Sequence, residues 1–168
     1  MQVIVLVLCL LFMQTAYGQR LAVKSNALSW AVATPDLGLE LVTGEKTSLA
    51  VSVYGQPFFK DYSFAVLQPE FRYWFNGRPL TQEYIGVTAF SASYDMHFSS
   101  RDYAGDGILV GVTGGYVISL AKRWCFELSG GTGLLFFRQM CNEDTSTFEL
   151  GYKLFPSKLA ASFIYIIK

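Results

Sequence analysis

The chain has 168 residues, of which 52% are hydrophobic and 16% aromatic, and its formal net charge is zero. This length suits a single domain, and the apolar content is sufficient for either a buried core or a lipid-facing surface. A chain without a basic excess has little to offer the phosphates of nucleic acid, so nucleic acid is not expected as a partner.

The first residues predict a secretory signal. Residues 3–13 form an apolar run that is too short to span a bilayer as a helix. Ala16 and Gly18 are small residues at the spacing that a signal peptidase reads. We therefore expect a signal peptide over 1–18 and a mature domain over 19–168. No lysine or arginine precedes the apolar run, which leaves a buried N-terminal element as the alternative.

The mature chain alternates apolar and polar residues between turn signals, which is typical of β-strands. Helical periodicity is nearly absent, and no linker divides the chain into domains. We expect eight strands, over 20–32, 36–43, 47–55, 63–75, 82–94, 107–120, 124–138 and 158–168.

The connections between these strands alternate in length from the second one onward. An up-and-down barrel of the outer membrane has short periplasmic turns at one end and longer extracellular loops at the other. A soluble Greek-key sandwich has no reason to show this alternation. Only the first connection is short where the pattern requires a long one. We expect turns at 43–46, 76–79 and 121–123, and longer loops at 55–62, 95–106 and 139–157.

The two faces of the strands favour a membrane barrel. The stretch LQPEFRYWF, residues 67–75, separates Phe71 and Tyr73 from Glu70 and Arg72, because successive side chains of a strand point to opposite faces. Across the other strands, the second face is small and polar, which suits the narrow interior of an eight-stranded barrel better than the core of a sandwich. We therefore expect an all-β, eight-stranded antiparallel up-and-down transmembrane barrel.

Charged residues with the parity to face the interior predict a polar cluster inside this barrel. Buried charges are costly unless they are paired, so we expect these residues to contact one another. The simplest role of the cluster is structural, and a gate or proton path is the alternative. Pro69 cannot donate to the ladder and predicts a local bulge. The expected members are Lys24, Glu40, Glu70, Arg72 and Glu127.

Aromatic residues gather near the strand ends, as in the two interfacial girdles of a membrane barrel. Trp74 and Trp124 lie beside short turns, and Trp30 lies near a longer connection. Cys125 and Cys141 lie at opposite ends of one expected strand, on the order of 50 Å apart at ~3.3 Å per residue. We therefore expect no disulfide between them.

One short motif could support catalysis. His97 and Ser99, in MHFSS, form a His-x-Ser pair in which the histidine could act as base and the serine as nucleophile. A class of outer-membrane lipid A deacylases is similar in carrying this pair on a barrel, but we expect a polar surface loop. One histidine and two distant cysteines cannot make a closed zinc site, and neither a metal nor a cofactor is expected.

Five segments of the mature chain are distinctive: LAVKSNAL, TPDLGLEL, LQPEFRYWF, LAKRW and FPSKLAASFIYIIK. Together they resemble a family of unknown function from anaerobic Gram-negative bacteria. Its members are short secreted chains regarded as small outer-membrane β-barrels, some of them encoded near fimbrial or OmpA-like genes. The resemblance implies a barrel in the outer membrane, and it brings no established activity and no catalytic residues.

The expected function is therefore that of a non-enzymatic outer-membrane barrel with a structural or surface-interaction role. Outer-membrane lipid would surround it, and a surface or fimbrial protein could bind the loops after 82–94 and 124–138. A lipid-modifying barrel enzyme, a narrow pore and a soluble periplasmic β-protein are the alternatives.

Overall fold

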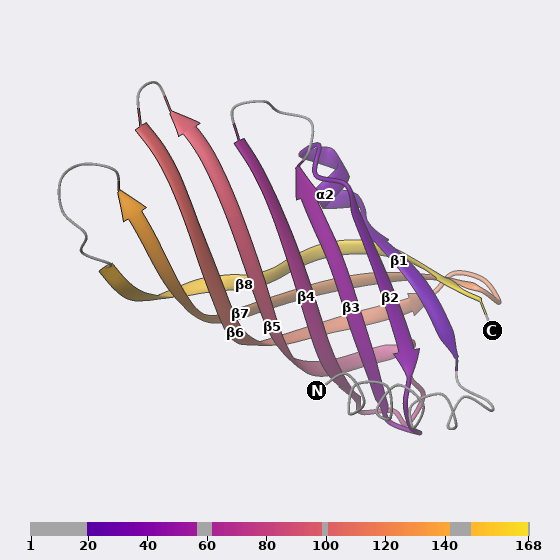
Figure 1. The fold of residues 1–168 in the computed structure, drawn as a ribbon. Coiled ribbons are helices and arrows are strands. Elements are labelled where there is room, and N and C mark those ends of the chain that lie inside the picture. Colours follow the sequence, from indigo (N-terminus) through magenta and orange to yellow (C-terminus); the bar gives the residue numbers. More distant parts are fainter. Residues whose placement is uncertain (1–19, 57–61, 99–100, 142–148, 168) are drawn as a thin grey trace, which may run out of the picture.

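The computed structural model describes residues 20–56, 62–98, 101–141 and 149–167, and the expected signal peptide over 1–18 lies outside them. Eight antiparallel strands pair in chain order, and the eighth pairs back with the first (Figure 1). The sheet thus closes into the predicted eight-stranded up-and-down barrel. The elements are β1 (Leu21–Asn26), α2 (Ala27–Ala31), β2 (Asp36–Val42), β3 (Thr47–Gln56), β4 (Tyr62–Trp74), β5 (Gln82–Phe98), β6 (Arg101–Ser119), β7 (Trp124–Cys141) and β8 (Glu149–Ile166).

The two ends of the barrel differ. The described chain begins and finishes at the same end, where Ala22 pairs with Ile166. We call this the turn end, because it also holds the connections at 43–46, 75–81 and 120–123. The opposite end, which we call the loop end, holds α2 and the far ends of the longest strands (Figure 1).

The predicted strand over 20–32 is shorter than expected, and a helix follows it. β1 ends at Asn26, whose side chain accepts a hydrogen bond from the backbone N–H of Leu28 at 3.1 Å and so caps α2. The first connection at the loop end therefore runs over 27–35, which removes the one exception to the expected pattern. Within the part of the chain described, no helix is long and apolar enough to cross a membrane.

Two of the three predicted long loops at this end, over 95–106 and 139–157, are largely strand. β5 and β6 remain paired up to Phe98 and Arg101, so most of the expected loop over 95–106 is a hairpin. β8 likewise begins at Glu149, well before the expected start at 158. An antiparallel ladder gains backbone hydrogen bonds with each further pair, and residues 95–98 contain no glycine or proline to interrupt it.

The prediction of a bulge at Pro69 was wrong. The register between β4 and β5 is the same on both sides of it, with Leu67 opposite Ser91 and Glu70 opposite Thr88. Pro69 faces outward, and its carbonyl accepts a hydrogen bond from the Thr88 hydroxyl at 3.0 Å. The Thr88 side chain of β5 thus supplies one hydrogen bond where the backbone pairing between β4 and β5 is interrupted.

A bulge does occur in β8, at Ser157. Gly131 of β7 lies opposite Lys158, whereas the next residue, Thr132, lies opposite Pro156. Ser157 is therefore the extra residue, and it is buried. Because a bulge shifts the alternation by one, the positions of β8 whose side chains face the interior change parity at Ser157.

The outer surface of the barrel is apolar, while the inward side chains of the same strands are buried. Every strand from β2 to β8 carries large hydrophobic side chains that are exposed on the outside. This is the division of faces that the alternation predicted. Representative outward residues are Leu39, Val51, Phe71, Val87, Val112, Leu128 and Phe163.

The apolar core lies inside the barrel at its turn end. The connection 75–81 folds back so that Leu80 is fully buried, and Leu80 has a backbone φ of 69°. Trp74 and Tyr84 pack beside it with ring centroids 4.9 Å apart. We call this group the turn-end plug, and it consists of Ala22, Trp74, Leu80, Tyr84, Val117, Cys125 and Ile164.

The cysteines follow the prediction as far as the structure describes them. β7 runs unbroken from Trp124 to Cys141, so the two cysteines stand at opposite ends of one strand. Cys125 is a buried free thiol within the turn-end plug.

Candidate functional site: a charged cluster inside the barrel

Arg72 of β4 is the centre of the interior polar site. Its guanidinium donates hydrogen bonds from Nη1 to Glu40 Oε2 at 2.8 Å and to Glu127 Oε2 at 2.9 Å. From Nη2 it donates to Glu70 Oε2 at 2.8 Å and to Glu127 Oε1 at 3.0 Å. Arg72 thus binds Glu127 with both nitrogens and two further carboxylates with one each. A planar fork of this kind suits paired carboxylates.

Two lysines complete the charges. Lys24 of β1 places Nζ 3.5 Å from Glu40 Oε2. Lys158 of β8 donates from Nζ to Glu70 Oε2 at 2.7 Å and to Glu127 Oε1 at 3.4 Å. The structure therefore brings all five predicted residues together and adds Lys158. Three carboxylates and three cations cancel in formal charge, which lowers the cost of burying them.

Lys158 was missed from the sequence although a signal was present. Like Ala160 and Ser162, it stands at an even position of β8, and those residues face the interior. The bulge at Ser157 turns both Ser157 and Lys158 inward. A strict alternation extended from the earlier part of β8 would place one of them outside.

Neutral donors hold the cluster from the turn end. The Tyr84 hydroxyl donates to Glu127 Oε1 at 2.8 Å. The guanidinium carbon of Arg72 lies 4.2 Å above the Tyr84 ring centroid, a favourable contact between a cation and an aromatic face. Tyr84 therefore belongs to the turn-end plug with its ring and to the charged cluster with its hydroxyl.

A second chain of hydrogen bonds reaches Glu40. Trp74 donates from Nε1 to the Ser48 hydroxyl at 2.9 Å, and Ser48 donates to Glu40 Oε1 at 2.6 Å. Because Glu40 Oε2 accepts from Arg72, both of its oxygens have short hydrogen bonds. Trp74 thereby helps to orient the Glu40 carboxylate through the Ser48 hydroxyl.

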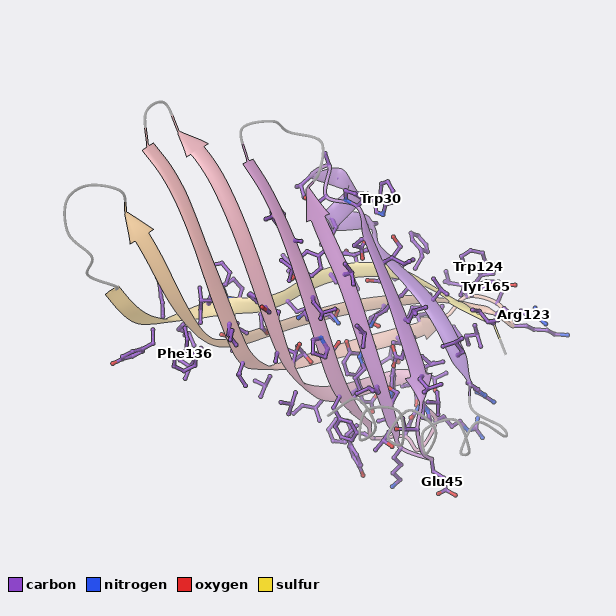
Figure 2. All side chains as sticks on the ribbon, in the orientation of Figure 1. Trp30, Glu45, Arg123, Trp124, Phe136 and Tyr165 are labelled. Carbon is purple, nitrogen blue, oxygen red and sulfur yellow. The ribbon has the colours of Figure 1, made fainter. Side chains whose placement is uncertain are left out.

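This position of Trp74 corrects its expected place among the interfacial aromatics. Trp74 is 0% exposed, whereas Trp30 and Trp124 are 59% and 50% exposed. Trp74 lies two residues after Arg72 on the same strand, so it shares the inward face. Figure 2 shows Trp124 at the turn end close to Tyr165, and Trp30 projecting from α2 at the other end.

Glycines make room for the cluster. A Cβ at Gly38 would lie 2.6 Å from Cγ of Lys24, so the lysine stem lies directly over the glycine. A Cβ at Gly86 would lie 2.6 Å from the Thr113 hydroxyl, which donates to Glu70. Small residues on the inner face therefore allow long charged side chains to fit in a narrow lumen.

The His-x-Ser motif is only partly described. His97 lies near the loop end of β5, where its backbone is paired with Asp102 of β6. Ser99 lies outside the described residues. Catalysis by this pair therefore stays a hypothesis from the sequence. Among the described residues, no group of three or more His, Cys, Asp or Glu side chains is placed to hold a metal ion.

The interior has three layers along the barrel axis. The turn-end plug closes one end, and the charged cluster follows it, with Arg72, Glu40 and Glu127 at zero exposure. On the loop side of the cluster lies a cavity of about 260 Å³. In this arrangement the turn-end plug and the paired charges close the lumen on the turn side of the cavity.

Fold and interior define a small eight-stranded β-barrel protein with an apolar exterior and a closed lumen. Over residues 3–167 the chain matches a family described as "Protein of unknown function (DUF3575)", and it belongs to that family. No curated protein and no solved structure gives a significant match.

Proposed function

We propose that the protein is a non-enzymatic β-barrel of the Gram-negative outer membrane with a structural or surface-interaction role. The observation that supports this most is the arrangement of the two faces. Large apolar side chains cover the outside, and the charged cluster is enclosed within. This is the distribution required in lipid, where a strand turns apolar residues outward and keeps polar ones in the lumen.

Aromatic residues at both ends support a membrane position. Trp124 and Tyr165 pack at the turn end with ring centroids 5.0 Å apart, beside the exposed Arg123 (Figure 2). Trp30 is exposed at the loop end and donates from Nε1 to the Ser25 hydroxyl at 2.8 Å. Indole and phenol rings favour the boundary between lipid and water.

The loop end is the proposed surface for a partner. β5 and β6 continue as a hairpin beyond the level of β1 and β2 (Figure 1). With the described termini at the turn end, in the periplasm, this hairpin and the one formed by β7 and β8 would face the exterior. A surface or fimbrial protein is the class of partner we propose for them.

The closed lumen argues against the pore alternative. The enzyme alternative has a direct test. Ser99→Ala should leave the masses of the lipid A species unchanged if the barrel is not a deacylase. Loss of a deacylated species in this variant would establish the enzyme instead.

Orientation tests the proposal most sharply. Val32, exposed at the loop end, and Lys122, exposed at the turn end, are each replaced by Cys in a background with Cys125→Ala and Cys141→Ala. With a maleimide that does not cross membranes, we expect labelling of Val32→Cys in intact cells and of Lys122→Cys only after lysis. Equal labelling of both, or the reverse order, would contradict the proposed surface role.

A further inference from the structure

The cavity at the loop side of the charged cluster has a defined floor and wall. Lys24, Gln68 and Lys158 line it next to the cluster. Its apolar lining includes Phe90 and Phe155. Its volume of about 260 Å³ is many times what one water needs, so the cavity has room for a compact polar group.

Lys24 is a surplus donor at this floor. It is buried, and its ammonium makes no hydrogen bond with any described residue. Its neighbour Glu40 is 3.5 Å away and already accepts shorter hydrogen bonds from Arg72 and Ser48. An ammonium carries three donors, and burying a donor without a partner is unfavourable. An acceptor that enters the cavity would remove this cost.

The two lysines of the lining balance carboxylates of the charged cluster, so the preference for an anion rests on the free donor of Lys24 and not on a net positive charge. Lys24 and Lys158 are cations, and Asp36 is the single acidic residue of the lining. Both oxygens of Asp36 already accept from the backbone N–H of Asn26 at 2.9 Å, and one also accepts from the Ser25 hydroxyl. The Asp36 carboxylate thus has hydrogen-bond donors from β1, whereas the Lys24 ammonium has no hydrogen-bond acceptor among the described residues.

The barrel wall beside the cavity is incomplete. The ladder between β1 and β8 reaches only to Asn26 and Ser162, and the Asn26 side chain then caps β8 by accepting from the N–H of Ala161 at 3.0 Å. Beyond this point no described strand pairs with β8 on its β1 side, where α2 is the element that contacts it. Leu154 and Leu159 are accordingly 68% and 75% exposed. Leu159 also lines the cavity, so the cavity lies next to this gap.

We propose that this cavity binds a compact anionic oxygen group, a carboxylate or phosphate, through Lys24. The group can arrive on an amphiphile whose apolar tail stays in the gap beside β8, or as a free ion from the loop end. The amphiphile source rests on the proposed outer-membrane location, whereas the cavity itself does not.

Calorimetric titration of the barrel, refolded in a neutral detergent, tests this proposal. The probes are octanoate, octanol as its uncharged match, and inorganic phosphate. The test variant is Lys24→Met, and the matched control is Lys122→Met, which removes an exposed lysine at the turn end. Ser52→Leu, which fills the cavity and keeps both lysines, guards against a folding defect of Lys24→Met. A gel shift between boiled and unboiled samples verifies that each variant is folded.

Loss of one charge-assisted hydrogen bond, about 1.5–3 kcal/mol, corresponds to a loss of affinity of about tenfold or more. We expect at least this loss in Lys24→Met and in Ser52→Leu, and none in Lys122→Met. Binding of phosphate would identify the free ion as sufficient. Binding of octanoate without phosphate would identify the amphiphile as the source.

Three outcomes overturn the inference: octanol binding as well as octanoate, affinity unchanged in Lys24→Met, or no binding of any probe to a folded barrel. None of these affects the proposed function, which depends on cellular location and orientation. Conversely, a failure of surface labelling in cells would leave the titration in detergent intact.

Discussion

Arg72 shows at the scale of one residue how this lumen is filled. Its two terminal nitrogens satisfy Glu40, Glu70 and Glu127, which come from three different strands. Burying an ion pair brings little net stability, but removing one partner leaves the others unpaired in a medium of low dielectric. The cluster therefore acts as a unit, and its centre is the residue whose loss costs most.

Arg72→Met should lower the free energy of unfolding by about 3–5 kcal/mol, because three carboxylates lose their common partner. Urea unfolding of the barrel refolded into lipid vesicles measures this. Arg78→Met is the matched control in an exposed turn, with an expected change within about 0.5 kcal/mol. A loss below about 1 kcal/mol in Arg72→Met would show that the cluster is not a unit.

The tryptophans distinguish inside from outside. In variants that keep a single tryptophan, with Phe at the other two positions, brominated lipid tails should quench the fluorescence of Trp124 strongly. Trp74 should be quenched little, because the sheet and the turn-end plug enclose it. Equal quenching of both would mean that the inward position of Trp74 is wrong.

At the scale of elements, Asn26 joins β1, α2 and β8. Its side-chain oxygen accepts from the N–H groups of Leu28 and Ala161, and its amide nitrogen donates to Ser29 at 2.8 Å. These bonds terminate the β1–β8 ladder, which is much shorter than the ladder between β6 and β7. The closure of the barrel therefore depends on one side chain more than its other seams do.

Asn26→Ala should cost about 1–2 kcal/mol of unfolding free energy, from the helix cap and one lost ladder partner. It should also speed hydrogen exchange at Ala161, whose N–H loses its acceptor. Ser91→Ala, at an exposed strand position, is the control and should change neither quantity. Unchanged exchange at Ala161 in Asn26→Ala would contradict the cap.

Leu80 combines burial with a strained backbone. Truncation to Ala removes a fully buried side chain and should cost about 2–5 kcal/mol. At ordinary φ, glycine in place of Ala would cost more still, but φ of 69° favours glycine. We therefore expect Leu80→Gly to be no less stable than Leu80→Ala. A Leu80→Gly barrel clearly weaker than Leu80→Ala by the same urea measurement would argue against the left-handed turn.

The sequence predicts where a side chain lies when that place follows from the alternation of residues along a strand. Alternation alone places Glu40, Glu70, Arg72 and Glu127 inside, because parity is preserved along each unbroken strand. Lys158 has the same parity as Ala160 and Ser162 and was overlooked, whereas the bulge that also turns Ser157 inward is absent from any periodic pattern. Alternation also misses α2, a five-residue helix that depends on the cap of Asn26 and on contacts with β8.

The loop end was the least predictable region for a related reason. Loop signals such as Asp, Ser and Gly occur through 95–106, yet the two chains stay paired there up to Phe98 and Arg101. Composition reports whether a residue tolerates a turn. It does not report whether an adjacent strand can pair with that residue through backbone hydrogen bonds. In a hairpin the adjacent strand is available for such pairing.

The whole molecule is inverted relative to a water-soluble domain, because its charges are enclosed and its large apolar side chains face outward. In water, so large an apolar exterior would drive association. In a membrane it is the required surface. The closed sheet also leaves few backbone groups unpaired, except along β8 beside the gap.

The most direct test of the central claim is to fractionate cells that express the protein and to run the membrane fraction on a gel, boiled and unboiled. The account predicts that the protein sediments with the outer membrane and that unboiled samples migrate differently, because the closed barrel resists detergent until it is heated. A soluble protein with one band that heating does not shift would contradict it.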